Sequence, residues 1–249
     1  MSYVAGNDHR GLLAMQADIR NWTAKGQRFA AAYFPEIGHD PYRQLDGQPP
    51  MSLLKRGHAL AVYQDAWLGE LLDELQRDGA LENTIIVFTS DHGMRWTPGS
   101  REGEVVLVAR GQLEDIELRV PMLIYVPRVL QQATIIDSPT SHIDITPTLL
   151  DLLGIMAGRE NEQGLPVYDH EISQRRLFLQ MDMFGASGFY YGGSYYSRSA
   201  MGFTYKCPTM NFQSSGMVRF GSSEAEEVRD ILAAQDANQD ALLSSVLDR

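Results

Sequence analysis

The feature that most constrains the fold is an apolar run that ends at an acid, an imidazole and a glycine, Asn83–Gly93. Residues 84–89 are β-branched or aromatic throughout, which favours a strand. A continuous apolar run of this length is typical of a parallel strand buried on both faces. Open α/β sheets carry their functional residues at the carboxyl ends of such strands, and there Asp91 and His92 follow. This pair can bind a metal ion and a charged substrate; the plainer alternative is a strand exit at which Asp91 caps a turn.

The composition is that of a globular protein and argues against several classes of partner. The 249 residues are 44% hydrophobic and 21% charged. A formal net charge of −11 argues against nucleic acid and acidic membranes, because both require a basic face. Anionic small substrates stay possible, because a bound metal inverts the local field. No apolar run approaches the roughly 18 residues of a membrane span, the first residues lack a signal-peptide pattern, and the compartment stays open.

Helix and strand signals alternate up to about Gly154. We predict helices from apolar residues at helical spacing and from end signals, and strands from β-branched and aromatic runs. The predicted helices are 12–26, 52–78 and 146–154, and the predicted strands are 28–34, 84–89 and 120–126. Thr146 is the expected N-cap of the third helix, because Pro147 suits a first helical position. The alternation predicts an α/β sheet flanked by helices.

Beyond Gly154 the pattern changes to short strand signals separated by Gly, Ser and Pro, which predicts an antiparallel meander. The predicted strands are 175–181, 189–196, 200–206 and 217–220. Ser223 and Glu226 form a capping-box pattern that begins a final helix. The sequence therefore predicts two parts, an α/β core over 1–158 and a smaller antiparallel subdomain with a terminal helix over 159–249.

Five motifs occur in the order that is typical of one family. They are His39-Asp40-Pro41-Tyr42, a helix with Tyr63, Asp65, Gly69 and Leu75, the run 83–93, the Arg-Val-Pro strand 119–124, and the Asp-Ile-x-Pro-Thr-Leu-Leu helix 144–155. Through these motifs the stretch from about Trp22 to Ile155 resembles the C-terminal portion of the sulfatase branch of the alkaline phosphatase superfamily. The resemblance implies an alkaline phosphatase/sulfatase-like fold and metal-dependent hydrolysis of sulfate esters.

The resemblance also implies roles for four residues. Asp91 and His92 match the metal-ligand pair of the family. His142 matches a further ligand that some superfamily members take from a downstream segment, although such a histidine is also common at a plain strand-to-helix junction. His39 matches a substrate-side histidine that binds an ester oxygen or protonates the leaving group. The implied cofactor is a divalent metal ion, calcium first and manganese or zinc next, and a single imidazole ligand favours a transition metal.

The family's nucleophile has no counterpart in the sequence. It is a formylglycine made from a Cys-x-Pro-x-Arg segment, or a threonine or serine, and it lies far upstream of the Asp-His-Gly motif in the family. Nothing before Trp22 resembles that region, and Cys207, the only cysteine, lies downstream without the required spacing. We therefore expect an incomplete chain. Strands without their neighbours would leave an open sheet edge and apolar surface, which predicts self-association.

Two other functions stay open at this point. A phosphodiesterase, or a phosphoethanolamine or glycerol-phosphate transferase, of the same superfamily fits the segments around His39 and His142 equally well. A non-catalytic remnant or binding module belongs to a different class. The absence of the nucleophile motif favours it, and the intact Asp91–His92 pair argues against it. For the enzyme classes, the expected partner is an anionic sulfate or phosphate ester.

Overall fold

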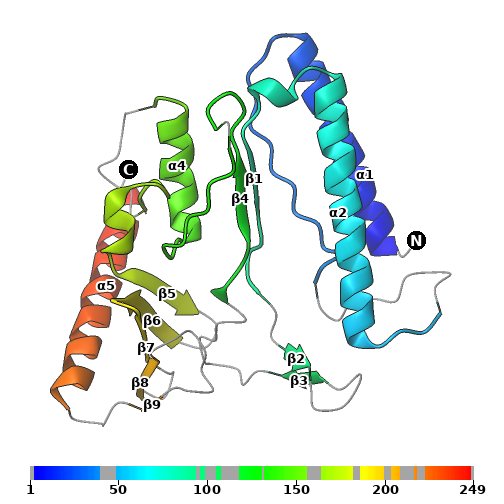
Figure 1. Ribbon diagram of the computed structural model, residues 1–249. Coiled ribbons are helices and arrows are strands. Elements are labelled where there is room, and N and C mark those ends of the chain that lie inside the picture. Colours follow the sequence, from blue (N-terminus) through cyan, green and yellow to red (C-terminus); the bar gives the residue numbers. More distant parts are fainter. Residues whose placement is uncertain are drawn as a thin grey trace. The chain divides into compact units, whose positions relative to one another are not determined.

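The structure, a computed structural model, forms two compact units (Figure 1). It describes residues 3–39, 49–93, 96–98, 105–107, 118–130, 132–155, 164–181, 186–198, 203–207, 216–217 and 222–247. The first unit comprises Met1–Asp91, Arg95–Leu107 and Val120–Ala133, and the second comprises His92–Met94, Val108–Arg119 and Thr134–Arg249. The division at residue 158 stays a prediction. Within the described ranges, no helix is both long and apolar enough to cross a membrane.

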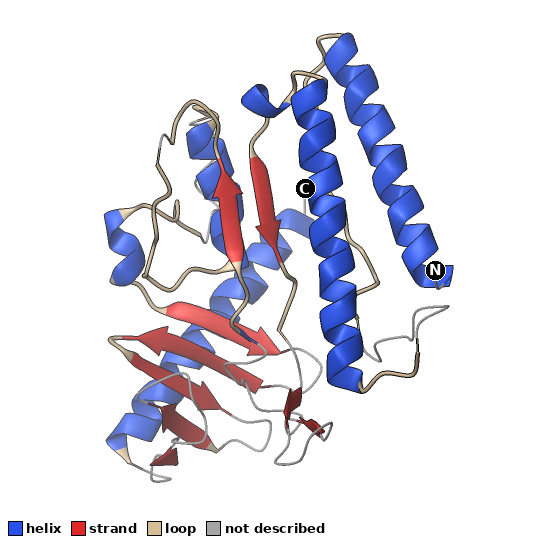
Figure 2. Ribbon diagram, turned by 45° about the vertical axis from the view of Figure 1, so that its right-hand side comes forward, coloured by secondary structure: helices blue, strands red, loops and turns tan. Residues whose placement is uncertain are grey.

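The first unit contains two long helices that lie side by side (Figures 1 and 2). They are α1 (Tyr3–Ala24) and α2 (Leu53–Arg77). Between them lie two buried clusters, one of Leu12, Ile37, Leu60 and Trp67 and another of Ile19, Leu75 and Ala80. Gly26 and Gly79 follow the helices with φ of 63° and 68°. This left-handed conformation costs glycine little, so both helix ends lie where the sequence predicts them.

The first turns of α1 are held by tertiary contacts that local sequence does not reveal. Residues 6–11 contain two glycines and an asparagine, which are weak helix formers, so the apolar pattern predicts a start only at residue 12. In the structure the Asp8 carboxylate accepts a hydrogen bond from the Ile37 amide at 2.7 Å. The His9 ring stacks on Trp67 with 5.3 Å between ring centroids. These contacts explain why the helix begins earlier than its periodicity suggests.

A two-stranded sheet in the first unit contains the apolar run. After the short helix η1 (Leu81–Asn83), β1 (Ile86–Thr89) pairs with β4 (Met122–Tyr125). The pairing is antiparallel, and Phe88 is 40% exposed. The prediction of a parallel strand buried on both faces is therefore wrong for the described part of the sheet. Composition indicates how apolar a strand is, whereas the direction of its partner depends on the path of the chain.

The strand predicted at 28–34 is also absent, since these residues pair with no strand of the described chain. Phe29 packs against the cluster of Ile19, Leu75 and Ala80. Phe34, at the other end of the segment, is 84% exposed. A strand requires a neighbour for its backbone donors and acceptors, and local sequence does not specify that neighbour. A further antiparallel pair in this unit joins β2 (Trp96–Pro98) to β3 (Val105–Leu107).

The second unit contains an antiparallel meander, as the sequence predicts. Its strands pair in chain order and are β5 (Leu177–Met181), β6 (Ala186–Tyr191), β7 (Ser194–Arg198), β8 (Thr204–Cys207) and β9 (Gly216–Met217). The segment 189–196, predicted as one strand, is divided between β6 and β7. Gly192 and Gly193 have φ of 56° and 78°, the conformation of a tight hairpin turn.

The terminal helix α5 (Ser223–Leu247) packs against this sheet (Figure 2). Phe189 of β6 is buried with Val228 and Leu232 of the helix. The N-terminal cap is one residue earlier than predicted: the Ser222 hydroxyl accepts a hydrogen bond from the Ala225 amide at 3.2 Å. The amides of the first helical turn have no acceptor within the helix, and a hydroxyl on the residue just before the helix can accept a hydrogen bond from one of them.

Candidate functional site

Asp91 and His92 lie just beyond β1, with one residue between Asp91 and the end of the strand at Thr89, and both side chains are exposed. The Ser90 hydroxyl lies 3.4 Å from Oδ1 of Asp91. Nδ1 of His92 lies 2.8 Å from the Gly93 carbonyl oxygen. A hydrogen bond to this carbonyl oxygen requires the tautomer with the proton on Nδ1, in which the lone pair of the neutral ring is on Nε2. Histidines that bind metals commonly have this arrangement, with the second ring nitrogen bonded to a backbone carbonyl.

These two side chains fit a divalent metal site as part of its ligand set. A carboxylate and a neutral imidazole are both good donors to manganese and zinc, whereas calcium takes about six to eight oxygen ligands. Among the described residues, no group of three or more His, Cys, Asp or Glu side chains is arranged to hold a metal ion. The assignment of Asp91, His92 and His142 as ligands therefore stays a prediction.

His39 lies in a turn beyond the segment that follows α1, and its side chain is exposed. Its backbone amide donates a hydrogen bond to the Glu36 carbonyl oxygen at 3.0 Å. The remaining residues of its motif, 40–42, lie outside the described residues. The substrate-side role of His39 is thus a prediction as well.

His142 begins η2 (His142–Asp144), which leads into α4 (Ile145–Leu152). The helical start is capped by Ser141, whose amide donates to Oδ2 of Asp144 at 2.7 Å, in a reciprocal capping box. The prediction of Thr146 as the N-cap is therefore wrong. The capping box places the first helical turn at the histidine, and His142 itself is exposed.

Asp144 is the centre of a buried polar network that the sequence analysis missed. Its carboxylate is 0% exposed and accepts two hydrogen bonds from the Arg175 guanidinium, that from Nη1 at 2.6 Å. The Leu165 amide donates to Oδ1 at 3.0 Å. Such paired, charge-assisted bonds are among the strongest in proteins. Arg175 is 31 positions away in sequence, and no local pattern connects the two residues.

Thr148 extends this network by one turn of α4. Its hydroxyl donates to the Asp144 carbonyl oxygen at 2.5 Å and accepts from the Val167 amide at 3.0 Å. Both bonds are buried. The segment 164–175 is thereby fastened to the start of α4, and the turn that bears His142 is rigidly supported. The Asp-Ile-x-Pro-Thr motif contains both of these anchoring residues, so its pattern has a structural reason besides any catalytic one.

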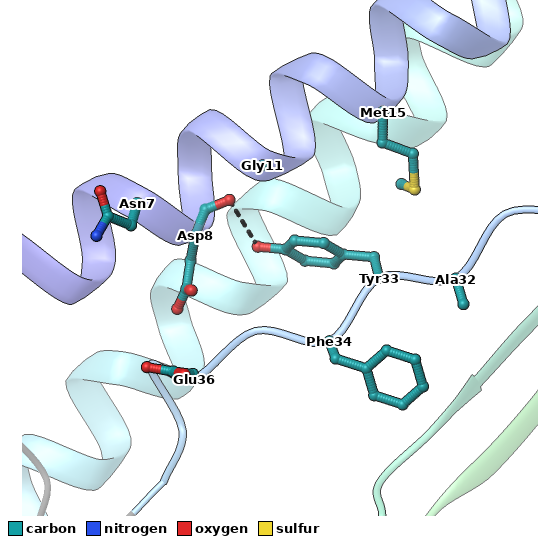
Figure 3. Close-up of a pocket in the computed structure, with 8 residues that line it drawn as sticks. All are labelled: Asn7, Asp8, Gly11, Met15, Ala32, Tyr33, Phe34 and Glu36. Carbon is teal, nitrogen blue, oxygen red and sulfur yellow. Dashed lines mark hydrogen bonds between the residues drawn. The ribbon is translucent and has the colours of Figure 1, made fainter.

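A cavity of about 470 Å³ opens between α1 and the segment after it (Figure 3). Its lining is mixed, with carboxylates, aromatic rings and a thioether: Asn7, Asp8, Gly11, Met15, Ala32, Tyr33, Phe34 and Glu36. Tyr33 points toward α1 and donates a hydrogen bond to the Asp8 carbonyl oxygen at 3.1 Å, whereas Phe34 points away from that helix. The sequence motifs did not indicate this cavity, and none of the predicted site residues lines it.

Tyr33 gives the first unit a specific dependence on alkaline pH. Burial, and then the nearby Asp8 carboxylate, raise the pKa of Tyr33 from 10.0 to about 12. As the pH rises, the Tyr33 hydroxyl loses its proton in the unfolded chain before it does so in the folded chain. The free energy of unfolding is therefore unaffected by this group below pH 10 and decreases between pH 10 and about 12. We expect Tyr33→Phe to weaken this decline and to lower stability near neutral pH by about 1 kcal/mol, through loss of the hydrogen bond.

Urea unfolding followed by tryptophan fluorescence at several pH values tests this expectation. Trp22, Trp67 and Trp96 all belong to the first unit, so the signal reports the relevant part of the chain. Tyr190→Phe, in the second unit, is the matched control and should leave the fluorescence-detected curve unchanged. If Tyr33→Phe loses as much stability between pH 10 and about 12 as the wild type does, the assignment of this pH dependence to Tyr33 is wrong.

Comparison with known proteins identifies the family of the chain. Residues 24–155 match the family described as Sulfatase. Choline-sulfatase from Rhizobium meliloti (strain 1021) is 39% identical over 93 residues, which are 37% of this chain and 17% of that protein. Arylsulfatase K from Gallus gallus is 29% identical over 137 residues, which are 55% of this chain and 24% of that protein. The lipoteichoic acid synthase-like YvgJ from Bacillus subtilis (strain 168) is 30% identical over 143 residues, which are 52% of this chain and 23% of that protein.

Solved structures show the same fold. A protein of the alkaline phosphatase superfamily from Vibrio parahaemolyticus superposes with a TM-score of 0.61 and 22% identity. The match covers 94% of this chain and 55% of that one. The predicted alkaline phosphatase/sulfatase-like fold is confirmed. This chain matches only about a quarter of the length of its curated relatives or less, and about half of its structural neighbour.

Proposed function

This chain belongs to the sulfatase family, and from that premise we propose that it supplies Asp91 and His92 to the divalent metal site of a hydrolase that cleaves sulfate esters. The observation that supports the proposal most directly is the position of the pair. Both residues lie in the loop just beyond β1, after Ser90, and the bond from Nδ1 of His92 to the Gly93 carbonyl orients Nε2 as a donor to metal.

Each predicted residue has a defined task in this proposal. A bound divalent ion would neutralise charge on the oxygens of the ester. Asp91 and His92 hold and orient that ion through one carboxylate and one ring nitrogen. His39, exposed on its turn, binds an ester oxygen or protonates the leaving group. His142 is proposed as a further ligand, on a turn kept rigid by the Asp144–Arg175 pair. Calcium is the first choice of metal on the family resemblance alone, and manganese and zinc, which the imidazole ligand favours, are the alternatives.

Phosphoryl chemistry is the second candidate, and one observation is compatible with it. The similarity to a lipoteichoic acid synthase-like protein extends over half of this chain, as far as the similarity to arylsulfatase K does. A site that neutralises sulfate oxygens presents the same kind of charge to a phosphate diester, so the ligand residues alone do not separate the two substrates.

The test combines metal binding with a choice of substrates. The full chain is stripped with a chelator and titrated calorimetrically with Ca²⁺, Mn²⁺ and Zn²⁺. It is then assayed with 4-nitrophenyl sulfate, 4-nitrophenyl phosphate and bis(4-nitrophenyl) phosphate. Metal-dependent release of 4-nitrophenol from the sulfate ester supports the proposal. Release of 4-nitrophenol from the phosphodiester alone supports the phosphoryl alternative. A chain that binds none of the three ions contradicts both and supports the non-catalytic binding module.

A further inference from the structure

The turn that bears His39 is tied to α1 by one charged side chain. The Ile37 amide donates a hydrogen bond to Oδ2 of Asp8 at 2.7 Å. A bond between a carboxylate and a backbone amide is charge-assisted and about twice as strong as a neutral one. Two residues further on, the His39 amide donates to the Glu36 carbonyl oxygen at 3.0 Å, which closes the turn.

The second helix supports the same turn from its other side. The Ile37 side chain is 4% exposed and is buried in a cluster with residues of both α1 and α2. A Cβ placed on Gly38 would lie 2.9 Å from Nε2 of Gln64, a residue of α2. The turn therefore lies directly against α2 at the residue before His39. The backbone around His39 is held on two sides, while the histidine side chain itself is exposed.

Asp8 is itself held firmly enough to act as an anchor. Its carbonyl oxygen accepts a hydrogen bond from the Tyr33 hydroxyl at 3.1 Å (Figure 3). The next residue, His9, stacks on Trp67 of α2 with 5.3 Å between ring centroids, and its Nε2 lies 2.9 Å from a Glu70 carboxylate oxygen. A side chain whose own surroundings are fixed in this way can hold its partner in one geometry.

We propose that Asp8 is a positioning residue for His39, which rests on the role proposed above for that histidine. A group that binds or protonates an ester oxygen must lie within about 3 Å of it. Displacement by about 1 Å costs up to about 100-fold in rate. The Asp8 carboxylate prevents such displacement by fixing the Ile37 amide. Asp8 lies before residues 24–155, which match the family, so the family match does not include this contact.

NMR of the full chain tests the contact without any substrate. His39→Gln identifies the ring signal of His39 among those of the other histidines. Asp8→Ala should accelerate hydrogen exchange of the Ile37 amide about tenfold or more, because its acceptor is lost. It should also shift the His39 ring signal. The ring signals of His142 and His170, which belong to the second unit, should stay unchanged.

Two further variants separate positioning from a general loss of stability. Asp8→Asn should keep the exchange rate of Ile37 and the His39 signal close to wild type, because the amide oxygen accepts the same hydrogen bond. Tyr33→Phe removes the neighbouring bond to the Asp8 carbonyl oxygen but leaves the carboxylate in place. It should therefore lower stability without shifting the His39 signal.

The kinetic counterpart uses 4-nitrophenyl sulfate. Asp8→Ala should lower kcat about tenfold or more, and Asp8→Asn should restore it. Three outcomes overturn the positioning role: an Ile37 amide that exchanges equally fast in wild type and Asp8→Ala, a His39 signal that Tyr33→Phe shifts as much as Asp8→Ala does, or an Asp8→Ala chain that does not fold. A wild-type chain that hydrolyses no ester contradicts the function proposed above instead, and the NMR measurements still decide whether Asp8 holds the turn.

Discussion

Asp144→Ala is expected to lower the free energy of unfolding of the second unit by about 3–5 kcal/mol, because it leaves the Arg175 guanidinium without its partner in a buried place. The carboxylate is 0% exposed, and the Arg175 side chain is 14% exposed. The substitution also removes the acceptor of the Ser141 and Leu165 amides. Urea unfolding measured by hydrogen exchange over residues 141–153 and 164–175 follows this loss directly.

Two controls separate the buried charge from a general effect of substitution. Arg176→Ala removes the neighbouring arginine, which is exposed and lies over the Tyr191 ring at 5.1 Å, and should cost less than about 1 kcal/mol. The double variant Asp144→Leu with Arg175→Met should recover part of the stability, because replacing both partners of a buried pair with apolar groups is often neutral. Equal losses in Asp144→Ala and Arg176→Ala would disprove a special role for the pair.

Asp91→Asn is expected to abolish metal binding at the proposed site. An asparagine keeps the shape of the side chain and removes the charge that a divalent ion requires. Loss of an outer-shell partner alone costs about 10–100-fold in metal affinity, so loss of a charged ligand should exceed about 100-fold. Any metal-dependent release of 4-nitrophenol from the sulfate ester should disappear together with metal binding. Calorimetric titration of the chelator-stripped chain with Mn²⁺ and Ca²⁺ measures the affinity.

The matched control for this variant is Asp73→Asn, on an exposed position of α2 in the same unit. It makes the same change in net charge and should leave metal affinity unchanged. His92→Gln should resemble Asp91→Asn, since it replaces the imidazole nitrogen, which has a lone pair for the metal, with an amide nitrogen that has none. If Asp91→Asn binds metal as tightly as Asp73→Asn does, Asp91 is not a ligand and the proposed site is elsewhere.

The sequence alone was sufficient for features that depend on neighbouring residues. The ends of the helices at Gly26 and Gly79 could be predicted because glycine readily adopts the left-handed conformation that ends a helix. The meander beyond residue 175 followed from short strand signals separated by turn residues. The family and its fold followed from motifs, each of which is contained in about a dozen residues.

Only the tertiary structure decided the features that join distant parts of the chain. The antiparallel partner of β1 and the pair between Asp144 and Arg175 depend on residues far away in sequence. So does the lack of a strand partner for residues 28–34 within the described part of the chain. Strand direction and ion pairing are properties of two segments together, whereas periodicity and propensity are properties of one. That is why Asp144 could be identified as part of a motif but not as the centre of a buried network.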